Sequence, residues 1–207
     1  MKRKSAFQAE TGEDAFGLIL CVIFFLGGVF IGTFTARALD DAGTWALYHS
    51  ISGYIYQIAD GTYVPPNFFS VLWSTGRYHF LVLFLGFSLL GVLCLPVVSG
   101  LQGFYLSFSI AAFIRAFGME GWPMAFSLFG LGALITVPSF LLLASQAFSS
   151  SLQLGKAGLG AGKLYFGSLY SKGYFMRALL CLAGILAAVL LELYLTPSLV
   201  TWVESIL

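Results

Sequence analysis

The chain carries very little charge for its length. Only 9% of its 207 residues are Asp, Glu, Lys or Arg, whereas 59% are hydrophobic. Soluble domains contain about 25% charged residues, so this chain has too few polar side chains to cover its apolar ones in water. The formal net charge of +1 provides no strongly basic surface for nucleic acid. The composition therefore predicts an integral membrane protein that does not bind nucleic acid.

Residue types that bind metals or perform catalysis are also scarce. The chain has two histidines, His49 and His79. Its three cysteines, Cys21, Cys94 and Cys181, all fall within apolar runs, and we interpret them as small buried side chains. No His-Glu-x-x-His, Gly-x-Ser-x-Gly or phosphate-loop motif is present. We therefore expect no enzymatic activity, no catalytic residue, no metal and no cofactor.

Long apolar runs are what the chain does contain. Because about 20 apolar residues cross a bilayer as a helix, these runs predict an all-α integral membrane protein with five transmembrane helices. The predicted spans cover residues 15–36, 78–95, 97–117, 123–148 and 175–195. The first run is long for a signal peptide, so we interpret it as a retained span. The whole chain, 1–207, is predicted to be one membrane domain.

Two longer segments connect these spans. Residues 37–76 contain apolar side chains at helical spacing together with many aromatic ones, which predicts an amphipathic helix on the outer membrane surface. Whether residues 68–73 enter the bilayer is left open by the sequence. Residues 149–174 are rich in glycine and serine and are expected to form a cytoplasmic loop.

The distribution of basic residues predicts the orientation. With the N-terminus in the cytoplasm, seven lysines and arginines lie inside, and three lie outside, namely Arg37, Arg77 and Arg115. Cytoplasmic segments of membrane proteins carry the excess of Lys and Arg. We therefore expect the N-terminus inside and, after five spans, the C-terminus outside.

Small residues at four-residue spacing predict where helices approach each other closely. Gly28 and Gly32 form such a pair in the first span, and Gly103, Ser107 and Ala111 form a row in the third. Small side chains let helix backbones come into contact within the membrane. These five residues are the predicted packing surface.

One proline lies in the interior of the fourth span. Pro138 removes a backbone hydrogen bond and crowds the carbonyl of Leu134, so a kink is expected there. We expect neighbouring helices or hydroxyls such as those of Thr136 and Ser139 to satisfy that carbonyl.

An acidic residue lies within the fifth span. An ionisable side chain inside a membrane is a candidate functional residue, and Glu192 is the best such candidate here. We expect it to pair with Arg115 or Arg77 at similar depth. Glu192 and Arg115 are the candidate intramembrane polar pair.

The segments predicted to be outside carry a candidate surface for partner proteins. Aromatic side chains are frequent anchors of protein interfaces. The candidate residues are Trp45, Tyr48, Tyr54, Trp73, Glu120 and Trp122.

Short motifs with glycine or proline, set within apolar segments, resemble those of a known protein family. They are the runs Phe25–Gly32, Gly100–Phe104, Gly118–Trp122 and Val137–Pro138. In order and spacing these runs resemble the stage II sporulation protein M family of endospore-forming bacteria. The resemblance covers about residues 16–154.

The resemblance implies a non-enzymatic scaffold in the mother-cell and septal membrane during sporulation. Members of that family anchor the stage II sporulation proteins D and P, which degrade septal peptidoglycan during engulfment. The alternative is a small transporter or permease-like subunit, which would need a polar cavity around Pro138 and Glu192. Association of two copies of the chain is left open by the sequence.

Overall fold

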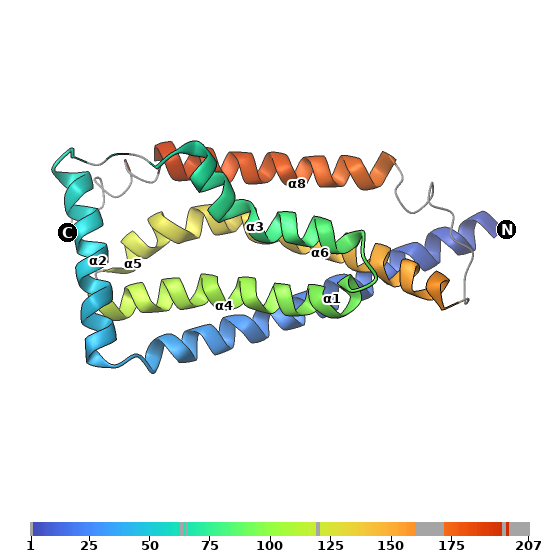
Figure 1. The fold of residues 1–207 in the computed structure, drawn as a ribbon, viewed down its shortest axis with the longest axis horizontal. Coiled ribbons are helices and arrows are strands. Elements are labelled where there is room, and N and C mark those ends of the chain that lie inside the picture. Colours follow the sequence, from blue (N-terminus) through green and yellow to red (C-terminus); the bar gives the residue numbers. More distant parts are fainter. Residues whose placement is uncertain are drawn as a thin grey trace.

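The chain folds into a long helical bundle (Figure 1). This computed structural model describes residues 2–62, 64, 66–118, 121–159, 172–195 and 198, and all regular elements among them are helical. Five helices are long and apolar enough to cross a membrane, which confirms the predicted all-α multi-pass architecture. The spans are Ala15–Arg37, Phe68–Gly86, Gly91–Phe117, Phe126–Gly158 and Gly173–Leu195.

The long helices run along the axis of the bundle, and shorter helices extend two of them. The N-terminus of α1 and the end of the last helix lie at opposite ends, as an odd number of spans requires (Figure 1). Two π-helical segments, η2 and η3, continue directly from α5 and α8. The elements in order are α1 (Lys2–Arg37), α2 (Asp41–Ala59), α3 (Phe68–Gly86), α4 (Gly91–Phe117), α5 (Gly121–Ala125), η2 (Phe126–Gly130), α6 (Leu131–Gly158), α8 (Lys172–Leu190) and η3 (Leu191–Leu195).

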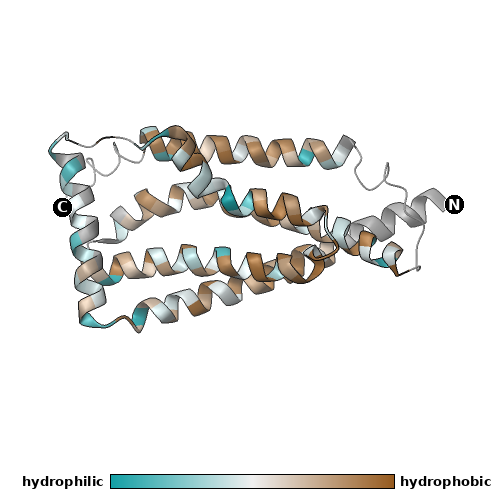
Figure 2. Cartoon of the chain, in the orientation of Figure 1, coloured by the Kyte–Doolittle hydropathy of each residue, from teal (hydrophilic) through white to brown (hydrophobic). Residues whose placement is uncertain are grey.

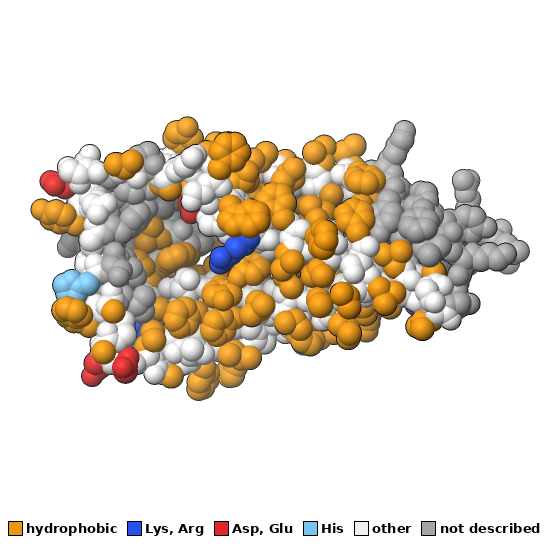
Figure 3. Space-filling model, viewed as in Figure 1, with side chains coloured by type: hydrophobic (Ala, Val, Ile, Leu, Met, Phe, Trp, Pro, Cys, Tyr) orange, Lys and Arg blue, Asp and Glu red, His pale blue; other side chains and the backbone are white. Residues whose placement is uncertain are grey.

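The core lies where α1, α3, α4, α6 and α8 meet. Its buried side chains include Val82, Leu95, Phe140, Leu143 and Ala147. Apolar residues predominate along the spans, which are mostly brown in Figure 2, and apolar side chains cover much of the outside, as the orange colouring in Figure 3 shows. Such a surface is suited to lipid rather than to water.

The cysteines lie where apolar packing was expected. Cys21 and Cys181 are buried, Cys94 is half-buried, and all three are free thiols. Cys21 and Cys181 both belong to the core between the helices.

Helix α2 crosses the end of the bundle instead of running along it (Figure 1). Its first turn is capped by Asp40, whose Oδ1 accepts a hydrogen bond from the backbone N–H of Gly43 at 2.9 Å. A carboxylate at this position satisfies an N–H group that has no partner within the helix. A helix was predicted in this part of segment 37–76.

The second predicted span was wrong in its boundaries. It was placed at 78–95, whereas α3 occupies Phe68–Gly86 and α4 already begins at Gly91. The short apolar piece 68–73 is thus the first part of a span, capped by Asn67, whose side chain accepts from the N–H of Phe69. The number of spans is unchanged because residues 91–95 belong to the next helix.

The reason for this break is a contact with α6. Ser151 of α6 donates to the carbonyl oxygens of Leu85, at 3.0 Å, and Ser88, which lie at the end of α3 and in the following turn. Gly86 lies against Ala147, and Gly91 lies against Ser151, without room for a side chain. Pro96, the residue after the predicted end of the second span, lies inside α4.

The predicted loop 149–174 was also wrong over its first part. Helix α6 continues to Gly158, and α8 begins at Lys172. Ser149 and Ser150 each donate to the carbonyl four residues earlier in α6. These serines are buried, so the helix face that they form is a packing surface.

Pro138 lies inside α6. The continuous helix formed by α5, η2 and α6 is bent along its length (Figure 1). The nearby hydroxyls do not bond to the carbonyl of Leu134 as expected. Thr136 Oγ1 donates to the carbonyl of Gly132, and Ser139 Oγ lies within hydrogen-bonding distance of the carbonyls of Ile135 and Thr136.

Candidate functional site

Helix α2 is fixed to the bundle by Arg115, near the end of α4. The guanidinium donates from Nε to Thr44 Oγ1 at 3.1 Å, from Nη2 to the carbonyl of Leu39 at 2.6 Å, and from Nη1 to the carbonyl of Arg37. Arginine presents several donors in a rigid planar fork, which suits it to bridge three groups at once. Arg115 therefore joins the end of α1, the start of α2 and the end of α4.

An aromatic contact adds to this attachment. The ring of Tyr48 in α2 lies 5.0 Å from that of Phe117, the last residue of α4. Trp45 packs its ring at 4.1 Å from that of His49, on the same helix. Helix α2 is thus held at a defined place rather than attached only through its connections.

Exposed aromatic side chains gather at this end of the bundle. Trp45 of α2 is 66% exposed, and Tyr48 and Tyr56 are exposed on the same helix. Trp122 in α5, which lies at the same end (Figure 1), is exposed as well. We call these four side chains, Trp45, Tyr48, Tyr56 and Trp122, the α2 platform.

The predicted partner surface is brought together only in part. Trp45, Tyr48 and Trp122 belong to the α2 platform, but Trp73 lies within span α3, where its ring stacks on that of Phe80. The side chain of Tyr54 and the whole of Glu120 lie outside the described residues. Tyr56 was not selected from the sequence, although its place among aromatic residues in the same helix was a usable signal.

The predicted packing surface is confirmed between α1 and α4 for all of its residues except Ala111. A Cβ atom on Gly28, Gly32 or Gly103 would overlap backbone atoms of the opposite helix. Ser107 faces Gly32, whereas Ala111 is half-buried one turn further along α4. Backbone contact of this kind is what small residues make possible in membrane helices.

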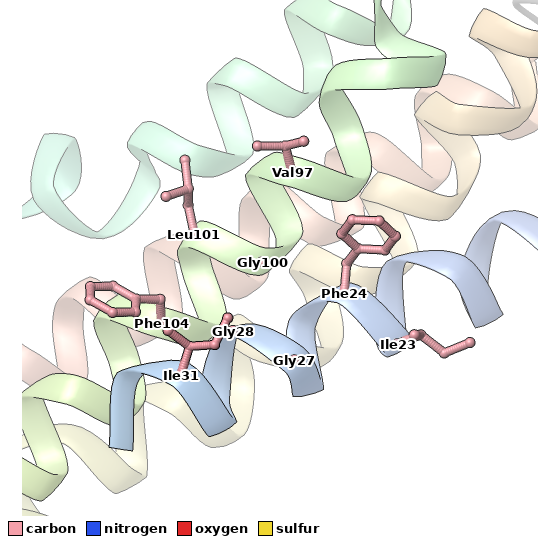
Figure 4. Close-up of a pocket in the computed structure, with 9 residues that line it drawn as sticks. All are labelled: Ile23, Phe24, Gly27, Gly28, Ile31, Val97, Gly100, Leu101 and Phe104. Atoms are coloured by element: carbon pink, nitrogen blue, oxygen red, sulfur yellow. The ribbon is translucent and has the colours of Figure 1, made fainter. Parts of the chain in front are cut away.

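An apolar groove of about 500 Å³ follows the same two helices on their lipid-facing side (Figure 4). Its floor is the contact of Gly28 with Gly100. Gly27, where an added Cβ atom would meet nothing within 4 Å, opens into it. The side chains around it include Phe24, Ile31, Val97, Leu101 and Phe104.

The predicted pair of Glu192 and Arg115 is wrong. Glu192 Oε2 accepts a hydrogen bond at 3.0 Å from Thr75 Oγ1 of α3, whereas Arg115 bonds to the start of α2. Glu192 lies in η3, the π-helical end of the last span. π-Helical turns are frequent at functional sites, so this carboxylate remains a candidate for a role in function.

Sequence reasoning missed a second polar contact, which lies deeper in the bundle. His79 of α3 is fully buried, and its Nε2 lies 3.3 Å from the carbonyl oxygen of Thr136 and 3.4 Å from Ser139 Oγ. Its ring also meets that of Phe140 edge-on. Thr75 and His79 are four residues apart and so share one face of α3, a spacing that was available as a signal.

These two contacts form a polar strip between α3, α6 and the last span. Glu192 and Thr75 lie one helical turn from His79 and its partners beside Pro138. Within the described ranges, no group of three or more His, Cys, Asp or Glu side chains could hold a metal ion. The strip offers hydrogen-bonding groups within the spans, where such groups are rare.

Comparisons with known proteins give no further assignment. No protein-family model, no curated protein and no solved structure matches the chain.

Proposed function

We propose that this protein is a non-enzymatic membrane scaffold that holds partner proteins at one face of the membrane. The observation that carries the proposal is the Arg115 attachment, which fixes α2 across the end of the bundle with Trp45 and Tyr48 exposed. Rigid exposed aromatic side chains lose little entropy on binding and frequently anchor interfaces. Trp45 and Tyr48 combine exposure with ring contacts, to His49 and to Phe117.

The nature of the partners follows from the family resemblance alone. If the chain functions like the stage II sporulation protein M family, the platform faces outward from the mother-cell and septal membrane. It then anchors and localises the peptidoglycan-degrading proteins of types D and P during engulfment. The sequence-based orientation, with the C-terminus outside, places α2 on that face.

Binding in nanodiscs tests this proposal. Full-length protein is incubated with purified D-type and P-type proteins, and the dissociation constants are measured. Trp45→Ala is expected to weaken binding by roughly tenfold, as for an aromatic anchor. Phe30→Ala is the matched control, because Phe30 is also 66% exposed but lies in span α1. Repeated failure of either partner to bind the wild-type protein would count against the scaffold.

The polar strip supports a second candidate, a small permease-like subunit. Glu192 with Thr75, and His79 with Thr136, bring polar groups next to Pro138 within the spans. Glu192→Gln separates the two candidates, because an amide can still accept the hydrogen bond of Thr75 but cannot carry a proton or a charge. Loss of cellular function with intact assembly favours transport, whereas a scaffold tolerates the change.

A further inference from the structure

Arg77 lies in the middle of a membrane span, not at its entrance as the sequence had suggested. It is the tenth of the 19 residues of α3, and a hydrophilic patch marks the middle of this helix in Figure 2. Its guanidinium carbon lies 5.8 Å from the ring centre of Tyr105 in α4. Tyr105 precedes Arg115 by ten residues, which corresponds to about 15 Å along the helix. Arg77 is therefore about half a bilayer core below the level of α2.

The side chain of Arg77 is exposed on the lateral surface of the bundle. Its guanidinium lies over the rings of Tyr78, at 5.0 Å, and Tyr105, and Tyr105 is itself 47% exposed. Figure 3 shows basic atoms among apolar side chains on one lateral face, beside a hollow. The contacts of Arg77 with other described residues are thus with aromatic rings, and the rest of its side chain faces outward from the bundle.

No carboxylate in the described part of the chain forms a salt bridge with Arg77. The acidic side chain within the spans, Glu192, bonds to Thr75. Residues two apart in a helix point to different sides, so Thr75 and Arg77 do not share a face. A cation–π contact offsets only part of the cost of placing a guanidinium at this depth.

The depth of Arg77 determines what can neutralise it. Lipid tails carry no charge, and a lipid phosphate about 15 Å away is beyond the reach of an arginine side chain. A carboxylate at mid-membrane depth meets the requirement, and it arrives on another membrane-spanning helix. Buried charges are paired when they are retained, and arginine pairs with carboxylates in bidentate geometry.

We propose that the lateral face around Arg77 binds a transmembrane helix of a partner protein that carries an acidic residue near its midpoint. The exposed side chains of Trp73, Leu81 and Phe84 continue the same side of α3 above and below Arg77. An apolar helix with one central carboxylate is complementary to this arrangement. This lateral surface is separate from the α2 platform, and binding to it does not require the proposed scaffold function.

The test uses full-length protein in phosphatidylcholine vesicles with model transmembrane helices. Labelled leucine–alanine helices with lysine ends carry either Glu, Gln or Lys at the midpoint, and association is measured by energy transfer. The Glu helix is expected to bind about tenfold more tightly than the Gln helix, as a charged hydrogen bond provides. The Lys helix is expected not to bind. In Arg77→Gln the preference for Glu disappears, and Arg77→Lys retains part of it.

Several outcomes would overturn the proposal. Equal binding of the Glu, Gln and Lys helices to the wild-type protein rules out recognition of a carboxylate. This outcome does not depend on whether any variant folds. A preference for Glu that survives in Arg77→Gln assigns it to another residue. Loss of the preference on adding phosphatidylglycerol assigns Arg77 to an anionic lipid headgroup. Energy transfer can also be measured between two labelled copies of the protein. Its loss in both Arg77→Gln and Glu192→Gln would show that the partner carboxylate of Arg77 is Glu192 of a second copy. Trp45→Ala, which alters only the α2 platform, serves as the control.

Discussion

Gly28 of α1 and Gly100 of α4 bring their two backbones into direct contact. A Cβ on Gly28 would overlap the carbonyl group of Gly100, and a Cβ on Gly103 would overlap the carbonyl oxygen of Phe25. In a bilayer, where apolar helices gain little from leaving lipid, such close van der Waals packing is a main source of association. The contact of α1 with α4 therefore depends on residues that have no side chain.

Gly28→Ala is expected to lower the stability of the protein in detergent by about 1–3 kcal/mol, because the methyl group forces the helices apart. Gly27→Ala is the matched control in the next position, where nothing lies within 4 Å. That change is expected to be neutral or to stabilise the helix by about 0.5–1 kcal/mol. Thermal unfolding followed by circular dichroism measures both, and equal melting temperatures for the two variants would contradict the packing described here.

Arg115→Ala is expected to release α2 from the bundle while leaving the spans intact. Three hydrogen bonds of the guanidinium are lost, two of them to the backbone carbonyls of Arg37 and Leu39. Hydrogen exchange of the α2 amides should become roughly tenfold or more faster, with α1 and α4 unchanged.

Arg37→Ala is the control for this experiment, because Arg37 contributes its carbonyl and not its side chain to the contact. Its exchange pattern should match that of the wild type. Unchanged protection of α2 in Arg115→Ala would show that the contact of Tyr48 with Phe117 is sufficient to hold the helix.

His79→Ala is expected to destabilise the protein by about 2–4 kcal/mol, since it leaves a cavity and removes the polar contact between α3 and α6. His79 is fully buried against Phe140, Thr136 and Ser139. Phe84→Ala changes an exposed side chain of the same helix and should have little effect in detergent. Chemical or thermal unfolding of the two variants gives the comparison, and similar losses would argue against a structural role of His79.

Ser151→Ala is expected to weaken the turn between α3 and α4 by about 1–3 kcal/mol, because the carbonyls of Leu85 and Ser88 lose a buried donor. Ser150→Ala is the neighbouring control, since Ser150 bonds within α6, to the carbonyl of Gln146. Proteolysis or cysteine accessibility in the turn measures the loosening. The assignment fails if Ser150→Ala has the larger effect.

The aromatic and basic residues of α3 show why its boundaries escaped prediction. Phe68–Trp73 is a short apolar piece interrupted by Ser74, Thr75 and Arg77, so hydropathy favoured a start at Tyr78. Asn67, which follows two prolines, caps the helix and correctly indicates a start at Phe68. The helix begins there despite the polar residues that follow. The polar residues are tolerated because Thr75 has Glu192 as a partner and Arg77 lies over two rings.

The sequence by itself determined the number of spans and the surface on which α1 and α4 meet. Both follow from local patterns, namely the length of apolar runs and the four-residue spacing of Gly28, Gly32, Gly103 and Ser107. Only the tertiary structure decided where α3 ends, which partners Glu192 and Arg115 have, and how α2 is held. These depend on Ser151, Thr75 and Thr44, which are distant in sequence from the groups that they contact. Hydrogen bonds between distant segments leave no periodic pattern along the chain. They become apparent only when the helices are seen packed together in three dimensions.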